Sequence, residues 1–207
     1  MTLKKALFIV FLILVVDQCI KVYIKTHFYL GESIHVFGLD WFQIYFVENE
    51  GAAWGAQLPG EYGKLALSLF RLIIAPLIGF WLIKSVKENA PKLLIIAVSL
   101  ILAGAIGNII DSLIYGVIFD NSTTSQVASF MPEAGGYASP LYGNVVDMLY
   151  FPFIKNATWP EWMPWIGGKT FTFFNAIFNI ADMAISTGVG ILLVFNKKVF
   201  PKTEAED

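Results

Sequence analysis

Charged residues are scarce in this chain. They make up 14% of the 207 residues, whereas 57% of the residues are hydrophobic. A soluble domain has about 25% charged residues. The hydrophobic residues gather in long runs, so the sequence predicts an integral membrane protein. The formal net charge of −2 gives no support for nucleic-acid binding.

Cysteine and histidine are scarcer still. Cys19 is the single cysteine, which excludes an intramolecular disulfide framework. His27 and His35 lie in a predicted loop, and no cysteine–histidine cluster has the spacing of metal ligands. The sequence therefore argues against a cysteine–histidine hydrolase or a zinc protease. We expect neither a metal nor another cofactor.

Four apolar runs are long enough to cross a bilayer, which takes about 20 helical residues. We predict one membrane domain over residues 1–207, with helices at about 6–24, 65–83, 93–118 and 175–195. The alternative for the first run is a cleaved signal peptide. Val16-Asp17-Gln18, just before Cys19, does not offer the small-residue cleavage site that such a peptide needs.

Two long loops separate these runs, over residues 26–64 and 119–170. In the first loop, residues 32–37 and 41–47 favour extended structure on either side of Gly38-Leu39-Asp40, which predicts a β-hairpin with a three-residue turn. The predicted fold class is therefore a mainly α membrane protein, with four transmembrane helices and a small β-hairpin or sheet subdomain outside the cytoplasm.

The second loop is rich in tryptophan. Trp159, Trp162 and Trp165 suggest a segment at the membrane interface, where such rings accumulate, or else ordinary loop packing.

Lysine placement predicts the topology. Eight lysines lie at the two chain ends and in the link between the second and third helices, and four lie in the much longer loops. The positive-inside rule then places both termini in the cytoplasm and both long loops outside.

Four acids lie in or beside the apolar runs: Asp17, Asp111, Asp147 and Asp182. An acid at the centre of a spanning helix costs about 2.5–3.5 kcal/mol, and its default explanation is a functional site. All four fall at or below the predicted outer interface. Asp182 in particular is placed roughly 10 Å below the outer start of the helix over 175–195.

Two carboxylates brought together cannot both ionise cheaply, so they share a proton and supply an acid and a base. This indicates an intramembrane aspartyl hydrolase. A proton-coupled transporter would use the same feature, and spacing alone does not decide between the two.

Two cations also lie in the apolar runs. Lys21 is four residues from Asp17 on one helix face, which predicts an ion pair that fixes the first helix against the bundle. Arg71 lies near the outer end of the second helix, where its long stem can reach the interface. In the third helix, Gly104, Ala105 and Gly107 form a small-residue surface for close helix packing.

Five motifs, spread in order from residue 17 to 182, resemble those of the bacterial lipoprotein signal peptidases (signal peptidase II). They are Asp17-Gln18-Cys19-Ile20-Lys21, Asn49-Glu50-Gly51-Ala52-Ala53-Trp54, Gly104-Ala105-Ile106-Gly107-Asn108-Ile109-Ile110-Asp111, Val145-Val146-Asp147-Met148 and Phe178-Asn179-Ile180-Ala181-Asp182.

The resemblance implies a catalytic dyad of Asp147 and Asp182. Further residues match family positions that bind substrate or support the site: Asn49, Gly51, Asn108, Asp111, Asn179, Asp17 and Lys21. It also implies an enzyme of the bacterial cytoplasmic (inner) membrane, in contact with membrane lipid. We expect the protein to be a monomer. Its substrate would be a prolipoprotein with a diacylglyceryl cysteine, cleaved just before that cysteine to release the signal peptide.

The chain departs from the family pattern in two places. Ser112 stands where the family commonly has arginine, so a basic contact is missing or supplied from elsewhere. The second long loop is also longer than usual, around residues 119–145 and 153–170. The alternatives are a small transporter, a lipid-binding membrane protein or an inactive relative. Four spans without an inverted repeat argue against a transporter, and retention of both aspartates argues against an inactive relative.

Overall fold

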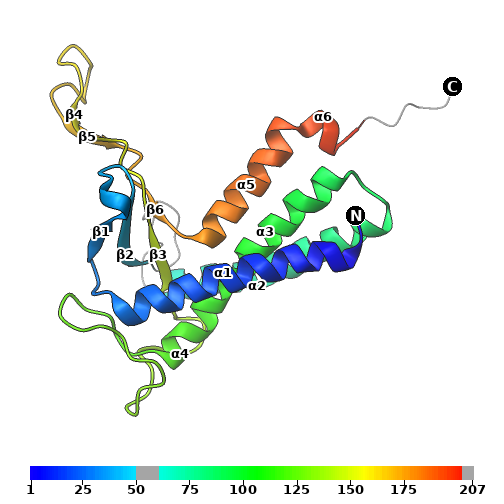
Figure 1. The fold of residues 1–207 in the computed structure, drawn as a ribbon, viewed down its shortest axis with the longest axis horizontal. Helices are drawn as coiled ribbons and strands as arrows, with labels where there is room; N and C mark the ends of the chain where they lie inside the picture. The colour runs from blue at the N-terminus through cyan, green and yellow to red at the C-terminus, as the bar shows by residue number, and fades with distance from the viewer. Residues whose placement is uncertain (50–60, 202–207) are drawn as a thin grey trace.

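The computed structural model describes residues 1–49 and 61–201. Figure 1 shows a bundle of helices with most of the strands gathered at one end. The elements in chain order are α1 (Leu3–His27), β1 (Ser33–His35), the 3₁₀ turn η1 (Val36–Gly38), β2 (Gln43–Asn49), α2 (Glu61–Lys87), α3 (Lys92–Ile110), the π-helical turn η3 (Asp111–Tyr115), α4 (Gly116–Ile118), β3 (Val145–Tyr150), β4 (Ile154–Thr158), β5 (Thr170–Phe173), β6 (Ile177–Phe178), α5 (Ile180–Val194) and α6 (Asn196–Val199).

Three of the described helical segments are long and apolar enough to cross a membrane: Leu3–His27, Tyr62–Lys87 and Lys92–Ile118. Large apolar side chains stay exposed on their outer faces, as Phe11 and Phe80 do at 63% and 68%. A soluble protein would bury such a surface, whereas lipid covers it in a membrane. The prediction of a mainly α membrane protein with a small sheet is confirmed.

The prediction of a fourth helix over 175–195 is wrong at the N-terminal end of that helix. Residues Ile177–Phe178 form β6, which pairs with β3, and the helix α5 begins only at Ile180. The Asn179 side chain caps this helix, which fixes its first residue. Asp182 therefore lies in the first turn of α5 and not about two turns inside a longer helix.

A four-stranded antiparallel sheet covers one end of the bundle, with strand order β1-β2-β3-β6. The hairpin between β1 and β2 was predicted, but its connection is longer than three residues because Val36–Gly38 coil into the turn η1. The strands β3 and β6 were not predicted. They come from the second long loop and its junction with α5, so the sheet joins three distant parts of the chain.

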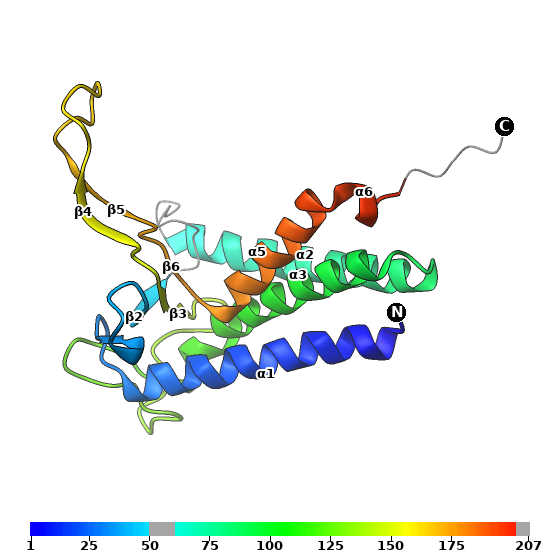
Figure 2. The same cartoon turned by 45° about the horizontal axis from the view of Figure 1, so that its top comes forward.

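The strands β4 and β5 form a separate two-stranded arm that extends away from the bundle (Figures 1 and 2). Trp159 stacks on Phe171, with ring centroids 4.3 Å apart. Trp162 and Trp165 are 80% and 90% exposed. Loop packing therefore accounts for Trp159 alone among the three tryptophans.

The helices pack most closely where small residues meet. A Cβ atom on Gly104 would lie 2.2 Å from the Ala181 carbonyl oxygen, and one on Gly107 would lie 2.8 Å from Asp17 Oδ2. The predicted small-residue surface on α3 is therefore confirmed. It lets α3 approach the start of α5 and the acid of α1, and this close approach positions the site described next.

Candidate active site

The two candidate catalytic aspartates come from different kinds of element. Asp147 lies within β3, opposite Val47 of β2, and is 2% exposed. Asp182 lies in the first turn of α5 and is partly exposed. The pairing of β6 with β3 leads the chain directly from the sheet into α5, so both carboxyl groups reach the junction between sheet and bundle.

Asn179 and Asn108 connect the two aspartates. The Asn179 Nδ2 group donates to Asp147 Oδ1 at 2.7 Å and to Asn108 Oδ1 at 3.2 Å. The Asn108 Nδ2 group donates to Asp182 Oδ1 at 2.8 Å. Asn179 and Asp182 also form a reciprocal capping box, in which Asp182 Oδ2 accepts from the Asn179 N–H at 3.3 Å. The rotamers of both carboxyl groups are thus fixed by amide donors.

The environment of Asp147 disfavours its charge. Burial, and then the nearby charge of Asp182, raise the pKa of Asp147 to about 7. Hydrogen bonds from Asn49 Nδ2, at 3.2 Å, and from Asn179, together with the charge of Lys21, oppose this rise. Near neutral pH the pair can therefore hold one proton, which gives one acid and one base in the same site.

A second cluster, which we call the Lys21 cluster, supports the pair from the bundle side. It consists of Asp17, Gln18, Lys21 and Asp111. Lys21 Nζ lies 3.1 Å from Asp17 Oδ2 and 2.8 Å from Asp111 Oδ2, and it donates to Asn108 Oδ1 at 3.0 Å. All three charged side chains are at most 1% exposed. The predicted ion pair of Asp17 and Lys21 is therefore one half of a three-membered ionic group.

The two acids of the Lys21 cluster hold the backbone beside each candidate catalytic residue. Asp17 Oδ1 accepts from the N–H of Ala181 at 2.9 Å, and Ala181 directly precedes Asp182. Asp111 Oδ2 accepts from the N–H of Val146 at 3.2 Å, and Val146 directly precedes Asp147. The helix α1 and the turn η3 thus fix the positions of β3 and α5 relative to one another.

Sequence reasoning missed several polar groups around this cluster. The Gln18 Nε2 group donates to Asp17 Oδ2 and to Asp111 Oδ1, both at 3.0 Å, and Gln18 Oε1 accepts from the Tyr115 hydroxyl at 3.1 Å. The sequence offered one signal for Gln18, which is a polar residue beside Asp17 within an apolar run. Gly51, which was predicted to belong to the site, lies outside the described residues.

Arg71 also lies closer to the site than the sequence suggests. Its Nη1 group donates to Ser112 Oγ at 3.3 Å, and Ser112 is 3% exposed. The Ser112 hydroxyl in turn donates to the Asn108 carbonyl oxygen at 3.1 Å. The side chain therefore reaches into the bundle beside α3, where Ser112 replaces the arginine expected from the family pattern.

A further ionic group, the Lys25 cluster, lies one helical turn along α1 and was not predicted. It consists of Lys25, Glu48, Ser122 and Asn144. Lys25 forms an ion pair with Glu48, and its Nζ group donates to Ser122 Oγ at 3.0 Å. Asn144 Nδ2 donates to Glu48 Oε2 at 2.9 Å. This cluster joins α1 and β2 to both ends of the segment between α4 and β3.

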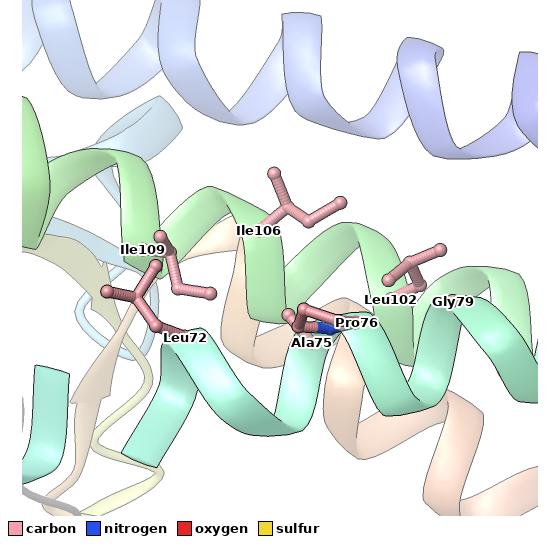
Figure 3. A pocket seen from close by; sticks show the side chains of 7 residues that line it. All are labelled: Leu72, Ala75, Pro76, Gly79, Leu102, Ile106 and Ile109. Carbon is pink, nitrogen blue, oxygen red and sulfur yellow. The ribbon is translucent and has the colours of Figure 1, made fainter. Parts of the chain in front are cut away.

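An apolar groove of about 360 Å³ runs between α2 and α3 (Figure 3). Its lining residues are Leu72, Ala75, Pro76, Gly79, Leu102, Ile106 and Ile109. Leu72 is adjacent to Arg71, and Ile109 to Asn108, so one end of the groove lies beside the site.

As for metals, no group of three or more His, Cys, Asp or Glu side chains in residues 1–49 and 61–201 is arranged to hold an ion.

Comparison with known proteins gives a consistent result. A family model described as signal peptidase (SPase) II matches residues 9–197. The lipoprotein signal peptidase of Porphyromonas gingivalis is 45% identical, and the match covers 96% of this chain and 90% of that protein. The lipoprotein signal peptidase of Amoebophilus asiaticus is 34% identical over 90% of this chain and 75% of its own length. These matches do not favour the transporter alternative.

Two solved structures share the fold. A bacterial membrane enzyme solved by the in meso method at 2.3 Å resolution has a TM-score of 0.61 and 24% sequence identity, with 99% of this chain and 95% of that chain covered. A second, at 1.9 Å resolution, has a TM-score of 0.58 and the same identity, with 97% and 96% covered. At this identity the likeness describes the fold alone.

Proposed function

The chain belongs to the signal peptidase II family, and we propose that it is an aspartic endopeptidase that removes the signal peptide from prolipoproteins. The substrate carries a diacylglyceryl group on its lipobox cysteine, and cleavage falls just before that cysteine. The observation that carries the proposal is the pair of aspartates bridged by Asn108 and Asn179 at the junction of sheet and bundle.

The proposed mechanism uses Asp147 and Asp182 as an acid–base pair. The ionised carboxylate takes a proton from a water molecule, whose oxygen attacks the scissile carbonyl carbon. The protonated carboxyl group hydrogen-bonds the carbonyl oxygen, where negative charge develops. The tetrahedral intermediate then collapses, the C–N bond breaks, and a proton passes to the amine of the lipidated cysteine. Asn49, Asn108 and Asn179 hold the two carboxyl groups in place for these steps.

The proposed topology places both termini in the cytoplasm and the site near the outer face of the bacterial inner membrane. The N-terminus and α6 lie at the same end of the bundle, opposite the sheet (Figure 1). Lys4, Lys5, Lys197 and Lys198 are at that end of the chain path, which agrees with the positive-inside rule. The exposed Trp162 and Trp165 then belong to the outer interface, and the groove between α2 and α3 gives the substrate a lateral approach.

Impermeant thiol labelling in intact cells tests this topology. In a Cys19→Ala background, Ser125→Cys in the second loop should react, and Lys87→Cys at the end of α2 should not. Both positions are exposed in the structure, so accessibility to a soluble reagent is matched. The reverse pattern would invert the proposed orientation.

The activity test uses purified protein in detergent with a diacylglyceryl-modified lipobox substrate, followed by gel shift. Wild type should cleave, and Asp147→Asn and Asp182→Asn should each abolish cleavage. Asp120→Asn is the matched control, because Asp120 lies in the second loop and accepts from the N–H of Ser129. Unchanged cleavage by either dyad variant would remove that residue from the mechanism, and no cleavage by folded wild type would contradict the proposed activity.

A further inference from the structure

The arm formed by β4 and β5 has an apolar surface that its own chain does not cover. Trp162 and Trp165, at its tip, are 80% and 90% exposed. Ile154 and Phe173, which pair at its base, are also largely exposed. An isolated two-stranded hairpin is at best marginally stable in water. Exposed apolar surface of this kind marks a contact with another protein or with a membrane.

The backbone of the tip holds these tryptophans outward. The tip is closed by its own hydrogen bonds, in which the Met163 N–H donates to the Pro160 carbonyl oxygen and the Gly168 N–H to the Trp159 carbonyl oxygen, both at 3.0 Å. Trp165 has a φ of 66°, in the left-handed region that glycine adopts freely and bulky residues rarely do. A strained backbone that presents an aromatic ring to solvent indicates that the ring has a function there.

The arm runs across the bundle and not along it. In both views it extends sideways from the sheet end, at a steep angle to α1 (Figures 1 and 2). Aromatic contacts fix its base to the sheet, because the ring centroid of Phe153 lies 6.1 Å from that of Trp41 and 5.8 Å from that of Phe174. Phe174 in turn contacts Phe178 of β6, at 5.9 Å. Since α1 crosses the membrane, an arm in this direction lies along the membrane surface.

The composition of the arm favours a lipid surface over a protein partner. Tryptophan accumulates at the level of the lipid headgroups. Residues 154–173 contain two lysines, Lys155 and Lys169, against one acid, Glu161, and all three are exposed. Protein interfaces are enriched in arginine and depleted in lysine, and this segment has no arginine. Lysines beside apolar rings are instead typical of segments that lie on a membrane.

We propose that the β4–β5 arm is an interfacial anchor, in which Trp162 and Trp165 enter the headgroup region of the bilayer and Lys155 and Lys169 bind lipid phosphates. The contact gives the sheet end of the bundle a second hold on the membrane, beside the spanning helices. This inference does not depend on the proposed peptidase activity. The proposed orientation decides only which leaflet the arm contacts.

The test is the accessibility of a spin label in protein reconstituted into vesicles of phosphatidylethanolamine and phosphatidylglycerol. In a Cys19→Ala background, Glu161→Cys places the label at the tip and leaves both tryptophans. Oxygen concentrates in lipid and a nickel chelate in water, so collisions with each reagent report the surroundings of the label. The tip label should be protected from the nickel chelate, as a label at Phe80→Cys on the exposed face of α2 should be. Ser125→Cys, in the exposed second loop, should be fully accessible to it.

The contribution of the rings is measured with Trp162→Ser/Trp165→Ser in the same Glu161→Cys protein. This variant should lose the protection and become as accessible as Ser125→Cys. The charge of the tip is the same with and without the rings, so the difference reports the tryptophans alone. A tip label as accessible as Ser125→Cys with both tryptophans present would overturn the proposal, because the arm would then stand in water. Protection from both reagents would also overturn it, because protein and not lipid would cover the arm.

The lysine contacts are measured in the same assay. Lys155→Gln/Lys169→Gln should lose part of the protection, and the loss should be larger in vesicles that contain anionic phosphatidylglycerol than in vesicles of phosphatidylcholine. Unchanged protection in both lipids would overturn the phosphate contact. No arm of the experiment requires cleavage, so an inactive wild type would contradict the proposed function and leave this result standing.

Discussion

The Lys21 and Lys25 clusters invite comparison because their lysines are one turn apart on the same helix. Both lysines are completely buried, and both pair with carboxylates. Lys21 bonds to Asp17, Asp111 and Asn108, which belong to α1, η3 and α3. Lys25 bonds to Glu48 of β2 and to Ser122 of the second loop. Its amine also lies over the rings of Phe119 and Tyr137, 5.5 Å and 4.9 Å from their centroids.

The partners of each lysine indicate what it does. The acids of the Lys21 cluster bind the backbone N–H groups of Ala181 and Val146, directly before the dyad residues. The Lys25 cluster touches neither dyad residue and ties the sheet and the second loop to the bundle. Its nearest link to the chemistry is Glu48, which precedes Asn49. Burial of a lysine is therefore no measure of catalytic importance, because that depends on which groups its partners hold.

The largest expected effect comes from breaking the Lys21 cluster. Asp111→Asn keeps the shape of the side chain but removes the charge that holds Lys21 and the N–H of Val146. A small displacement of Asp147 then costs about 10²-fold in kcat. Cleavage kinetics on the diacylglyceryl substrate would measure it, with Asp120→Asn as the surface control. A kcat close to that of the control would show that Asp111 does not position the dyad.

Breaking the Lys25 cluster should chiefly lower stability. Lys25→Met leaves Glu48 buried without its cation, and such a loss costs about 3–5 kcal/mol. Chemical unfolding in mixed micelles would measure the free energy of unfolding, and kcat would be expressed per folded molecule. We expect kcat to stay within a few-fold of wild type. A loss of kcat as large as that of Asp111→Asn, at unchanged stability, would mean that the two clusters have the same role.

These two clusters also show which polar contacts can be predicted from the sequence and which cannot. The convergence of Asp17, Asp111, Asp147 and Asp182 was predictable in outline, because charges in apolar runs must find polar partners. The structure does bring all four into one hydrogen-bonded region. Lys25 carried no such signal. It ends an apolar run, where a lysine can simply reach the interface, and its partners Glu48 and Ser122 lie 23 and 97 residues away.

The start of α5 could not be predicted for a related reason. Residues 175–178 are as apolar and aromatic as the helix that follows them, so hydrophobicity alone continues the helix backward. Ile177–Phe178 form a strand because they pair with β3. The residues of β3 were themselves predicted to be part of a loop, so this pairing could not be foreseen. The register of β2 with β3, which brings Asn49 near Asp147, is likewise a tertiary choice.

The pH dependence of stability should separate the dyad from the Lys25 cluster. The folded protein keeps the proton of Asp147 up to about pH 7, whereas the unfolded chain releases it near 3.8. The unfolded state therefore binds fewer protons between these values, and stability falls as pH rises, by up to about 1.4 kcal/mol per pH unit.

Asp147→Asn should remove this slope and be more stable than wild type above about pH 7. Glu48→Gln, in the Lys25 cluster, should retain the slope of wild type. Unfolding free energies measured across the range from about pH 4 to pH 8 would check both. Parallel curves for wild type and Asp147→Asn would show that Asp147 titrates normally in the folded protein.

The smallest expected effect is in the double variant Lys25→Met/Glu48→Gln. Most of the loss in Lys25→Met comes from the unpaired charge of Glu48 and not from the missing attraction, and a neutral glutamine removes that charge. Its Oε1 atom can still accept from Ser122 or Asn144, which now bond to Glu48. The double variant should therefore lie within about 1 kcal/mol of wild type in unfolding free energy. The corresponding double variant of the other cluster, Lys21→Met/Asp111→Asn, still leaves Asp17 without its cation. It should stay impaired in kcat, because Val146 and Asn108 have also lost charged partners. Recovery of kcat there would show that charge balance, and not geometry, is what the Lys21 cluster supplies.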